Sequence, residues 1–146
     1  MNEVGLIGLG VMGANLLLNI HENYSKLLSG FDISDDKINQ FKKKNKNFKS
    51  ILLFSNLQEF VLSLKTPRKI IILIPSGKYV DILLSDLLPL LSENDNLLDG
   101  GNEWYKNTEA RQLLTSNKNI NYIGCGISGG EKGARNGPCM MAGGTK

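Results

Sequence analysis

The 146-residue sequence has little cysteine, one histidine and no long apolar run, and each shortage excludes a class of protein. Its two cysteines, Cys125 and Cys139, belong to no C-x-x-C motif and no larger framework, so we interpret both as reduced thiols. One histidine and two separate cysteines cannot supply a zinc site, so no metal is expected. No apolar run reaches the roughly 18 residues of a spanning helix. We therefore expect a cytoplasmic protein that makes no contact with a membrane.

The excess of positive over negative charge is also small, since 17 basic residues against 14 acidic ones leave a net charge of +3. Much of the excess lies in FKKKNKNFK, residues 41–49, and no basic or aromatic face elsewhere extends it. We interpret this cluster as a solvated helix end, and no nucleic acid partner is expected. His21, near the end of the first expected helix, is interpreted as a surface residue.

Short apolar runs alternate with helical patterns along the whole chain. This alternation predicts one α/β domain over residues 1–146, with a Rossmann-like, doubly wound, mostly parallel sheet and helices on both faces. Apolar stripes at helical spacing predict core-facing helices over 57–64 and 80–91, the first capped by Asn56 with Glu59 three residues on. The expected strands are Glu3–Ile7, Leu27–Asp32, Ser50–Phe54, Lys69–Ile74, Asn96–Asp99 and Asn121–Ile123, with a further strand-like run at 139–142.

A G-x-G-x-x-G motif follows the first expected strand and opens a helix, which is the context of a dinucleotide-binding turn. In such a turn the first glycine permits the tight bend, the second lets the backbone approach a pyrophosphate, and the third lets the helix pack on the strand. The amino end of the helix then attracts the phosphates. The motif consists of Gly8, Leu9, Gly10, Val11, Met12 and Gly13.

Asp32 ends the second expected strand, close to the roughly 20 residues past Gly13 at which an acid accepts hydrogen bonds from the adenosine ribose. A carboxylate there repels a 2′-phosphate, and no arginine lies between Asp32 and Phe48. Lys37 and Lys42 remain as cations within reach. The alternative is that Asp32 caps the next helix.

Two further segments are candidates for binding. Asn102 follows the fifth expected strand, where an amide can orient a hydroxyl and a nicotinamide, or can simply serve the turn. The glycine-rich segment 124–144 is either a flexible tether or a binding segment, and its apolar and charged residues favour binding.

Four stretches in register, GLGVMGANL, LKTPRKIIILIPSG, DGGNEWYKNTEAR and GISGGEKGARNGPCMMAGG, resemble the long form of the 6-phosphogluconate dehydrogenase family. The S-G-G-E-x-G-A-R-x-G-P block separates it from β-hydroxyacid dehydrogenases. The resemblance implies an oxidoreductase of the pentose phosphate pathway that oxidises and decarboxylates 6-phosphogluconate to ribulose 5-phosphate, with NADP as the usual cofactor. It also implies a large helical C-terminal domain, absent from this chain, and a homodimer.

The family pattern assigns roles to residues of this chain. Gly8 to Gly13 would bind the pyrophosphate, and Asn102 would contact both cofactor and substrate. The adenosine ribose would lie at Asp32, Ile33 and Ser34, the dinucleotide would be lined by Ile74, Pro75 and Ser76, and the substrate would be held by Ser128, Gly129 and Gly130. The family's general base lysine and acid glutamate would lie beyond Lys146. This chain therefore contains no expected catalytic residue and is not expected to turn over alone.

The chain departs from the family pattern in three places, two single residues and one tripeptide. Gly10 stands where alanine is common, and Pro75 replaces a frequent lysine. Asp32-Ile33-Ser34 replaces Asn-Arg-Thr, which removes the guanidinium that would bind a 2′-phosphate, so the residues favour NAD where the family favours NADP. Two alternative functions remain open: a β-hydroxyacid dehydrogenase acting on another small acid, and a dinucleotide-binding module without catalysis.

Overall fold

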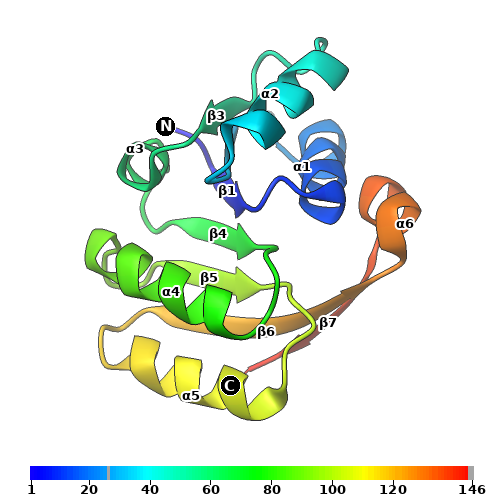
Figure 1. Cartoon of the computed structure of the whole chain (residues 1–146). Coiled ribbons are helices and arrows are strands. Elements are labelled where there is room, and N and C mark those ends of the chain that lie inside the picture. The colour runs from blue at the N-terminus through cyan, green and yellow to red at the C-terminus, as the bar shows by residue number, and fades with distance from the viewer. Residues whose placement is uncertain (26, 145–146) are drawn as a thin grey trace.

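The computed structural model describes residues 1–25 and 27–144 as a central sheet flanked by helices (Figure 1). The strands are β1 (Val4–Ile7), β2 (Leu28–Phe31), β3 (Leu52–Phe54), β4 (Lys69–Ile72), β5 (Asn96–Asp99), β6 (Asn121–Ser128) and β7 (Cys139–Gly143). The helices are α1 (Val11–Asn23), α2 (Asp35–Lys44), α3 (Leu57–Leu62), α4 (Lys78–Leu87), α5 (Tyr105–Ser116) and α6 (Gly130–Asn136), with a short 3-10 helix η1 (Leu88–Leu90) after α4.

The seven-stranded sheet has the order β3-β2-β1-β4-β5-β6-β7. Strands β1 to β6 are parallel, and β7 runs antiparallel to β6. Ile7 pairs with Ile72 and Ile72 pairs with Asp99, so β1, β4 and β5 end level with one another. The strand order reverses between β1 and β4, which is where doubly wound sheets bind ligands. The expected fold class is confirmed.

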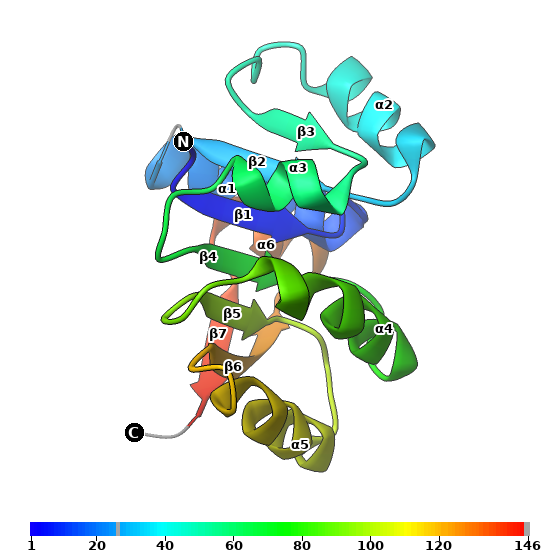
Figure 2. The ribbon, with the colours of Figure 1, turned by 90° about the vertical axis from the view of Figure 1, so that its left-hand side faces the viewer.

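Helices cover both faces of the sheet, and each face has its own core. In Figure 2, α3, α4 and α5 lie in front of the sheet, while α1 and α6 lie behind it. Phe60, Leu84 and Ile72 belong to one core cluster, whereas Leu17 and Phe41 belong to the other. Burying a side chain of this size stabilises the fold by roughly 1.5–3 kcal/mol. The loops at the strand ends are therefore anchored on a firmly packed sheet.

The helices begin and face as the apolar patterns predict. Asn56 caps α3, because its Oδ1 accepts a hydrogen bond from the Glu59 amide at 3.0 Å. The stripe of α4 and η1 is buried at Val80, Leu84, Leu87 and Leu88. The predicted stripe over 80–91 is divided, however, because Pro89 lies in η1 and cannot donate the hydrogen bond that would continue an α-helix.

The glycine-rich segment is not a flexible tether, and the strand-like run at 139–142 lies in β7, as expected. Most of it is regular: β6 continues to Ser128, α6 follows at once, and β7 returns beside β6. The expected strand ended at Ile123, because glycines at 124 and 126 weaken the sequence signal for a strand. The extra length is stabilised by the pairing of β6 with β7, from Gly124 with Gly143 to Ser128 with Cys139.

His21 is not a surface residue, which corrects the expectation for it. Its side chain is buried, its Nε2 lies 2.7 Å from the Ser50 Oγ, and its ring packs edge-on against Phe48. The partners follow it by about 30 residues, so spacing along α1 alone gave no sign of them. Histidine here is a packed residue of the core on the α1 face.

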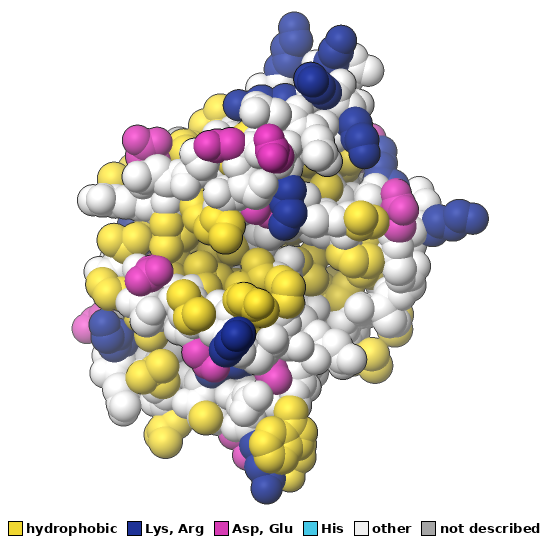
Figure 3. Space-filling view, in the orientation of Figure 1, with side chains coloured by type: hydrophobic (Ala, Val, Ile, Leu, Met, Phe, Trp, Pro, Cys, Tyr) yellow, Lys and Arg dark blue, Asp and Glu magenta, His cyan; other side chains and the backbone are white. Residues whose placement is uncertain are grey.

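The lysine cluster is exposed, as the composition predicts. Lys42, Lys43 and Lys44 close α2, and Lys46 and Lys49 follow it, all in contact with solvent. Figure 3 shows the basic side chains gathered at the end of the molecule where α2 lies. Within residues 1–25 and 27–144, no helix is both long and apolar enough to cross a bilayer. The same residues contain no cluster of His, Cys, Asp and Glu able to hold a metal ion.

Candidate functional site

The turn between β1 and α1 is shaped by its glycines. Gly8 has φ +102°, and a Cβ there would lie 2.2 Å from the Leu73 carbonyl oxygen. A Cβ on Gly13 would lie 1.8 Å from the Gly8 carbonyl oxygen. Both positions therefore exclude any side chain, as the motif predicts. At Gly10, by contrast, a Cβ would meet nothing within 4 Å, so the space beside this residue is open.

The amino end of α1 suits a phosphate group. Gly10 is the N-cap and has no side chain to accept a hydrogen bond from the first turn, which also contains no acidic residue. The partial positive charge of the helix end therefore has no side-chain counter-charge in that turn. A cleft of about 350 Å³ lies alongside, lined among others by Gly10, Val11, Lys37 and Glu131. Free amide donors, positive potential and open space fit a pyrophosphate.

Asp32 faces inward at the end of β2. It is 5% exposed, and its carboxylate accepts hydrogen bonds from the amides of Leu9 at 2.8 Å and Ser34 at 2.9 Å. The Lys37 Nζ lies 3.5 Å from the same carboxylate. Ser34, not Asp32, caps α2. Ile33 is 86% exposed, so it is the side chain that faces open space at the predicted ribose position.

Three strand ends bring their loops into contact. A Cβ on Gly8 would lie 3.0 Å from the Ile74 Cγ2, and one on Gly101 would lie 3.7 Å from the Ile74 carbonyl oxygen and 3.8 Å from the Ser76 Cβ. Pro75 and Ser76 are exposed, as is Asn102. The glycine turn, the segment 74–76 and the segment 100–102 thus form one continuous edge. Their roles in binding stay predictions.

The end of β6 joins this edge from the other side. A Cβ on Gly100 would lie 2.7 Å from the Ile127 Cδ1, so Ile127, which directly precedes the turn of Ser128, Gly129 and Gly130, packs against Gly100. Gly129 has φ +115° and Gly130 has φ +60°, backbone conformations that favour glycine. All three residues of the turn are exposed.

Helix α6 fixes this turn against α1. The Asn19 side-chain amide donates to the Ala134 carbonyl at 3.0 Å, and Ala134 itself is fully buried. Arg135 forms a bidentate ion pair with Glu22, at 2.6 Å and 2.7 Å. The helix that follows the candidate substrate turn is therefore fixed to α1, the helix that follows the glycine turn.

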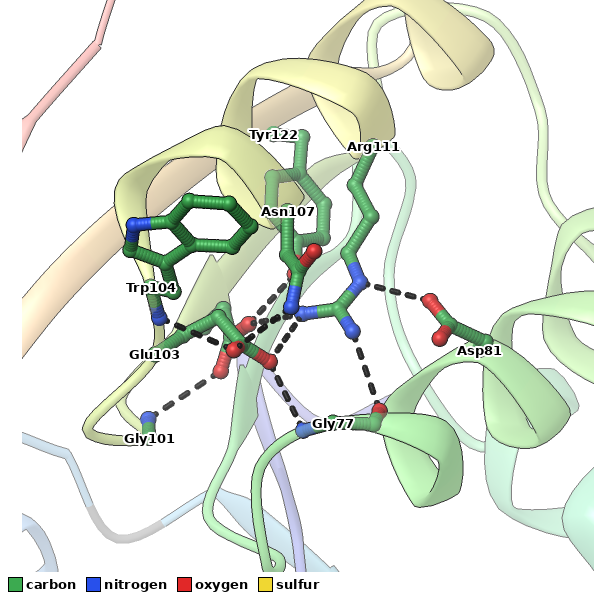
Figure 4. A network of polar contacts seen from close by, with 9 residues as sticks. Gly77, Asp81, Gly101, Glu103, Trp104, Asn107, Arg111 and Tyr122 are labelled. Carbon is green, nitrogen blue, oxygen red and sulfur yellow. Dashed lines mark hydrogen bonds and ion pairs between the residues drawn. The ribbon is translucent and has the colours of Figure 1, made fainter.

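A network of charged groups around the buried Arg111 joins the segments 74–77 and 99–104 to Asp81, which is 62% exposed at its side chain (Figure 4). Arg111 is 3% exposed at its side chain and contacts Asp81, Asp99 and Glu103. Burial opposes ionisation of Glu103, but hydrogen bonds from Arg111, the Gly77 amide and others outweigh it and lower the pKa of Glu103 to about 2. Burial also opposes ionisation of Arg111 and so lowers its pKa. The hydrogen bonds of Arg111 to Asp81 and Glu103 outweigh this effect and raise its pKa above the ordinary value.

Comparison with known proteins identifies the family. Residues 3–146 match the model of the NAD binding domain of 6-phosphogluconate dehydrogenase. The chain belongs to this family. A decarboxylating 6-phosphogluconate dehydrogenase of Chlamydia muridarum is 46% identical over 143 residues, which cover 98% of this chain and 30% of the relative. The chain thus spans about 30% of the length of that relative, and the family resemblance is confirmed.

Further members differ in their cofactor. Two decarboxylating 6-phosphogluconate dehydrogenases of Bacillus subtilis, one named NADP⁺-dependent and one NAD⁺-dependent, are each 42% identical to this chain. They are matched over 99% of this chain and over 30% and 31% of their own lengths. A 6-phosphogluconate dehydrogenase of Plasmodium falciparum, solved with NADP⁺ and with 6-phosphogluconate, superposes with a TM-score of 0.92 at 39% identity, over 99% of this chain and 31% of that one.

Sequence reasoning missed the polar network around Arg111. Glu103, Arg111 and Tyr122 were not among the candidates, although the first two lie in the motif DGGNEWYKNTEAR that carries the resemblance. The only available signal was two charged residues close to Asn102. Their burial depends on contacts with Gly77 and Asp81, which are about 30 residues earlier in the chain.

Proposed function

We propose that this chain binds NAD or NADP across the ends of β1 and β4, as the cofactor domain of a decarboxylating 6-phosphogluconate dehydrogenase. One observation carries the proposal: the glycine turn and the segments 74–76 and 100–102 lie against one another at the ends of β1, β4 and β5, and Gly100 lies against Ile127, just before the turn 128–130. The glycine turn has the steric form of a pyrophosphate loop. We place the substrate at the turn 128–130, facing the cofactor. Ligands of doubly wound sheets bind at this edge.

Each segment has a distinct task in this proposal. The amino end of α1 neutralises the pyrophosphate, with Gly10 leaving room for it. Asn102 orients both the cofactor and the sugar acid, and Ser128, Gly129 and Gly130 hold the carboxylate and hydroxyls of 6-phosphogluconate. The nicotinamide, when bound, would supply the hydride acceptor. Orientation of the two ligands is the chain's share of catalysis.

We assign proton transfer to residues beyond Lys146. In the family pattern a lysine base and a glutamate acid belong to a helical domain, and homodimer formation completes the site. The proposed compartment is the cytoplasm, where Cys125 and Cys139 stay reduced. Both are free thiols, and burial raises the pKa of Cys125, which keeps it protonated and unreactive.

The cofactor preference is proposed to be NAD at least as much as NADP. Ile33 occupies the exposed position beside the ribose site and offers no charge to a 2′-phosphate. The buried Asp32 adds negative potential, which Lys37 offsets in part at 3.5 Å. The family contains enzymes of both preferences.

A pair of variants at Gly10 tests dinucleotide binding. Gly10→Glu places a carboxylate in open space, so the fold is expected to remain intact while the pyrophosphate is repelled. Gly10→Ala adds only a methyl group and is expected to bind as the wild type does. Calorimetric titration with NADH and NADPH measures binding, and thermal unfolding checks the fold. Unchanged binding in a folded Gly10→Glu chain would contradict the proposal.

The substrate is tested by a second titration, with the chain saturated with NADH. We expect 6-phosphogluconate to bind and 3-hydroxyisobutyrate, a β-hydroxyacid without the phosphate, to bind far more weakly. The reverse order would favour a β-hydroxyacid dehydrogenase. Ser128→Ala should weaken binding of 6-phosphogluconate without changing the affinity for NADH.

A further inference from the structure

The charged groups around Arg111 add polar contacts between two loops of the candidate site. One loop, residues 73–77, leads from β4 into α4, and the other, residues 100–104, leads from β5 into α5. Figure 4 shows Arg111 reaching from α5 toward both, with Glu103 between them. The side chains of Arg111 and Glu103 are 3% and 8% exposed, so this connection is shielded from water.

Every nitrogen of the Arg111 guanidinium has a partner. Its Nε donates to the Asp81 Oδ1 at 2.8 Å, its Nη1 to the Glu103 Oε2 at 2.6 Å, and its Nη2 to the Gly77 carbonyl at 3.0 Å. The Asp99 Oδ2 lies 3.5 Å from the Nη1. This planar set of donors fixes the direction of each contact, which a lysine ammonium does not do.

Glu103 completes the connection by accepting the remaining donors. Its Oε2 accepts from the Gly77 amide at 2.7 Å, and its Oε1 accepts from the Trp104 amide and the Asn107 side chain, each at 2.9 Å. Gly77 is thus held at both its N–H and its C=O by Glu103 and Arg111. Its φ of +84° is a conformation that glycine adopts without strain.

Asp99 extends the network toward Asn102. Its Oδ1 accepts from the Gly101 amide at 3.0 Å, and its Oδ2 accepts from the Tyr122 hydroxyl. Asn102 therefore lies between two tethered residues, Gly101 and Glu103. Buried ion pairs are often no more stabilising than apolar side chains of the same volume, so geometry is the property that this network supplies best.

We propose that Arg111 and Glu103 are positioning residues that hold the segment 74–76 and Asn102 at a fixed separation, so that both contact the same bound dinucleotide. This role rests on the proposed function. We place neither residue in contact with the ligand, because their side chains are only 3% and 8% exposed and their charged atoms are already bonded to Gly77, Asp81 and one another. Their effect is therefore selective: it acts on the part of the ligand that reaches Asn102, not on the part held by the glycine turn.

Two probes separate these parts of the site. ADP reaches the glycine turn and the ribose position only, whereas NADH also reaches Asn102. We expect Glu103→Gln, which keeps the size and one acceptor of the side chain, to bind ADP within twofold of the wild type but NADH about tenfold more weakly. Arg111→Met should show the same pattern more strongly, and Arg111→Lys should restore binding only in part.

Trp104, the single tryptophan, provides an independent measurement because it adjoins Glu103 and is 58% exposed. Its emission is expected to shift in Glu103→Gln before any ligand is added. The matched control is Arg68→Met, which removes an arginine from its buried ion pair with Asp95 at the opposite ends of β4 and β5 and should leave the emission and both affinities unchanged.

The outcomes distinguish this role from the function on which it rests. A wild-type chain that binds no dinucleotide would contradict both. If the wild type binds but Glu103→Gln loses ADP and NADH equally, or loses neither, the positioning role is wrong and the proposed function stands. If Arg111→Met does not fold, the isosteric Glu103→Gln and the Trp104 emission decide the question.

Discussion

The glycine turn after β1 and the charge network around Arg111 both fix a loop at the same edge of the sheet, but they do so by opposite means. The glycine turn depends on the absence of side chains at Gly8 and Gly13, since any side chain there would overlap backbone atoms. The loop at Gly77 depends on side chains instead: Glu103 accepts a hydrogen bond from the Gly77 amide, and Arg111 donates one to the Gly77 carbonyl.

This difference determines how each region responds to changes of pH and salt. Steric exclusion does not depend on pH or salt, so the turn that would hold the pyrophosphate keeps its shape wherever the fold survives. Hydrogen bonds between ionised groups depend on their protonation. The region around Asn102 is therefore the one that solution conditions can loosen.

The largest expected effect tests the steric half of the comparison. Gly13→Ala would place a Cβ 1.8 Å from the Gly8 carbonyl oxygen, and backbone cannot give way cheaply. We expect a loss of about 3 kcal/mol or more in the free energy of unfolding, measured by urea denaturation. Gly10→Ala is the control, with an expected change within about 0.5 kcal/mol. Equal effects of the two variants would break the steric explanation.

The next effect tests the electrostatic half. The pKa of Glu103 is lowered from 4.5 to about 2 in the folded state, which corresponds to stabilisation on the order of 3 kcal/mol. This contribution is complete above the unfolded-state pKa of 4.5 and disappears as the pH falls toward 2. We therefore expect the stability difference between the wild type and Glu103→Gln to shrink over that range. Urea denaturation at a series of pH values measures it, and a constant difference would contradict the assignment.

A smaller effect sharpens the comparison at the ribose position. Ile33→Arg would place a guanidinium at a site that is 86% exposed and follows Asp32, whose carboxylate accepts from the Leu9 amide of the glycine turn. We expect NADPH to bind about tenfold more tightly, about 1.4 kcal/mol, because arginine pairs with phosphate through two parallel hydrogen bonds. Affinity for NADH should stay within twofold. Ile33→Met, long but uncharged, is the control, and calorimetry measures all four affinities.

The smallest effect marks the boundary between buried and exposed charge. Arg135→Met breaks the bidentate pair with Glu22, whose members are 31% and 39% exposed. Because solvent screens such a pair, we expect its loss to lower the free energy of unfolding by less than about 1 kcal/mol, as measured by urea denaturation. A loss as large as that of Glu103→Gln would show that burial does not distinguish the two ion pairs.

The sequence predicted those features that local patterns determine. The glycine motif, the parallel strands and the apolar stripes of α3 and α4 each follow from the periods of strands and helices, and the structure confirms them. The motif also located the open space at Gly10. Candidate residues near Asn102 followed from the rule that ligands bind at the ends of parallel strands.

The remaining features depend on contacts between distant segments. His21 is buried by Phe48 and Ser50, and Arg111 by Asp81 and Gly77, and no spacing along a single helix reveals such partners. The continuation of β6 through two glycines depends on β7, which pairs with it from later in the chain. Long-range pairing of this kind overrides local propensity.

Strand β7 lies at the edge of the sheet, and its five residues are all exposed and uncharged. Its outer row of amides and carbonyls is a template to which another strand can add, and no lysine or proline in it discourages such growth. At high concentration we therefore expect the isolated chain to aggregate by pairing at this edge strand while it is still folded. Shelf life and crystallisation behaviour would then depend on five residues far from the glycine turn.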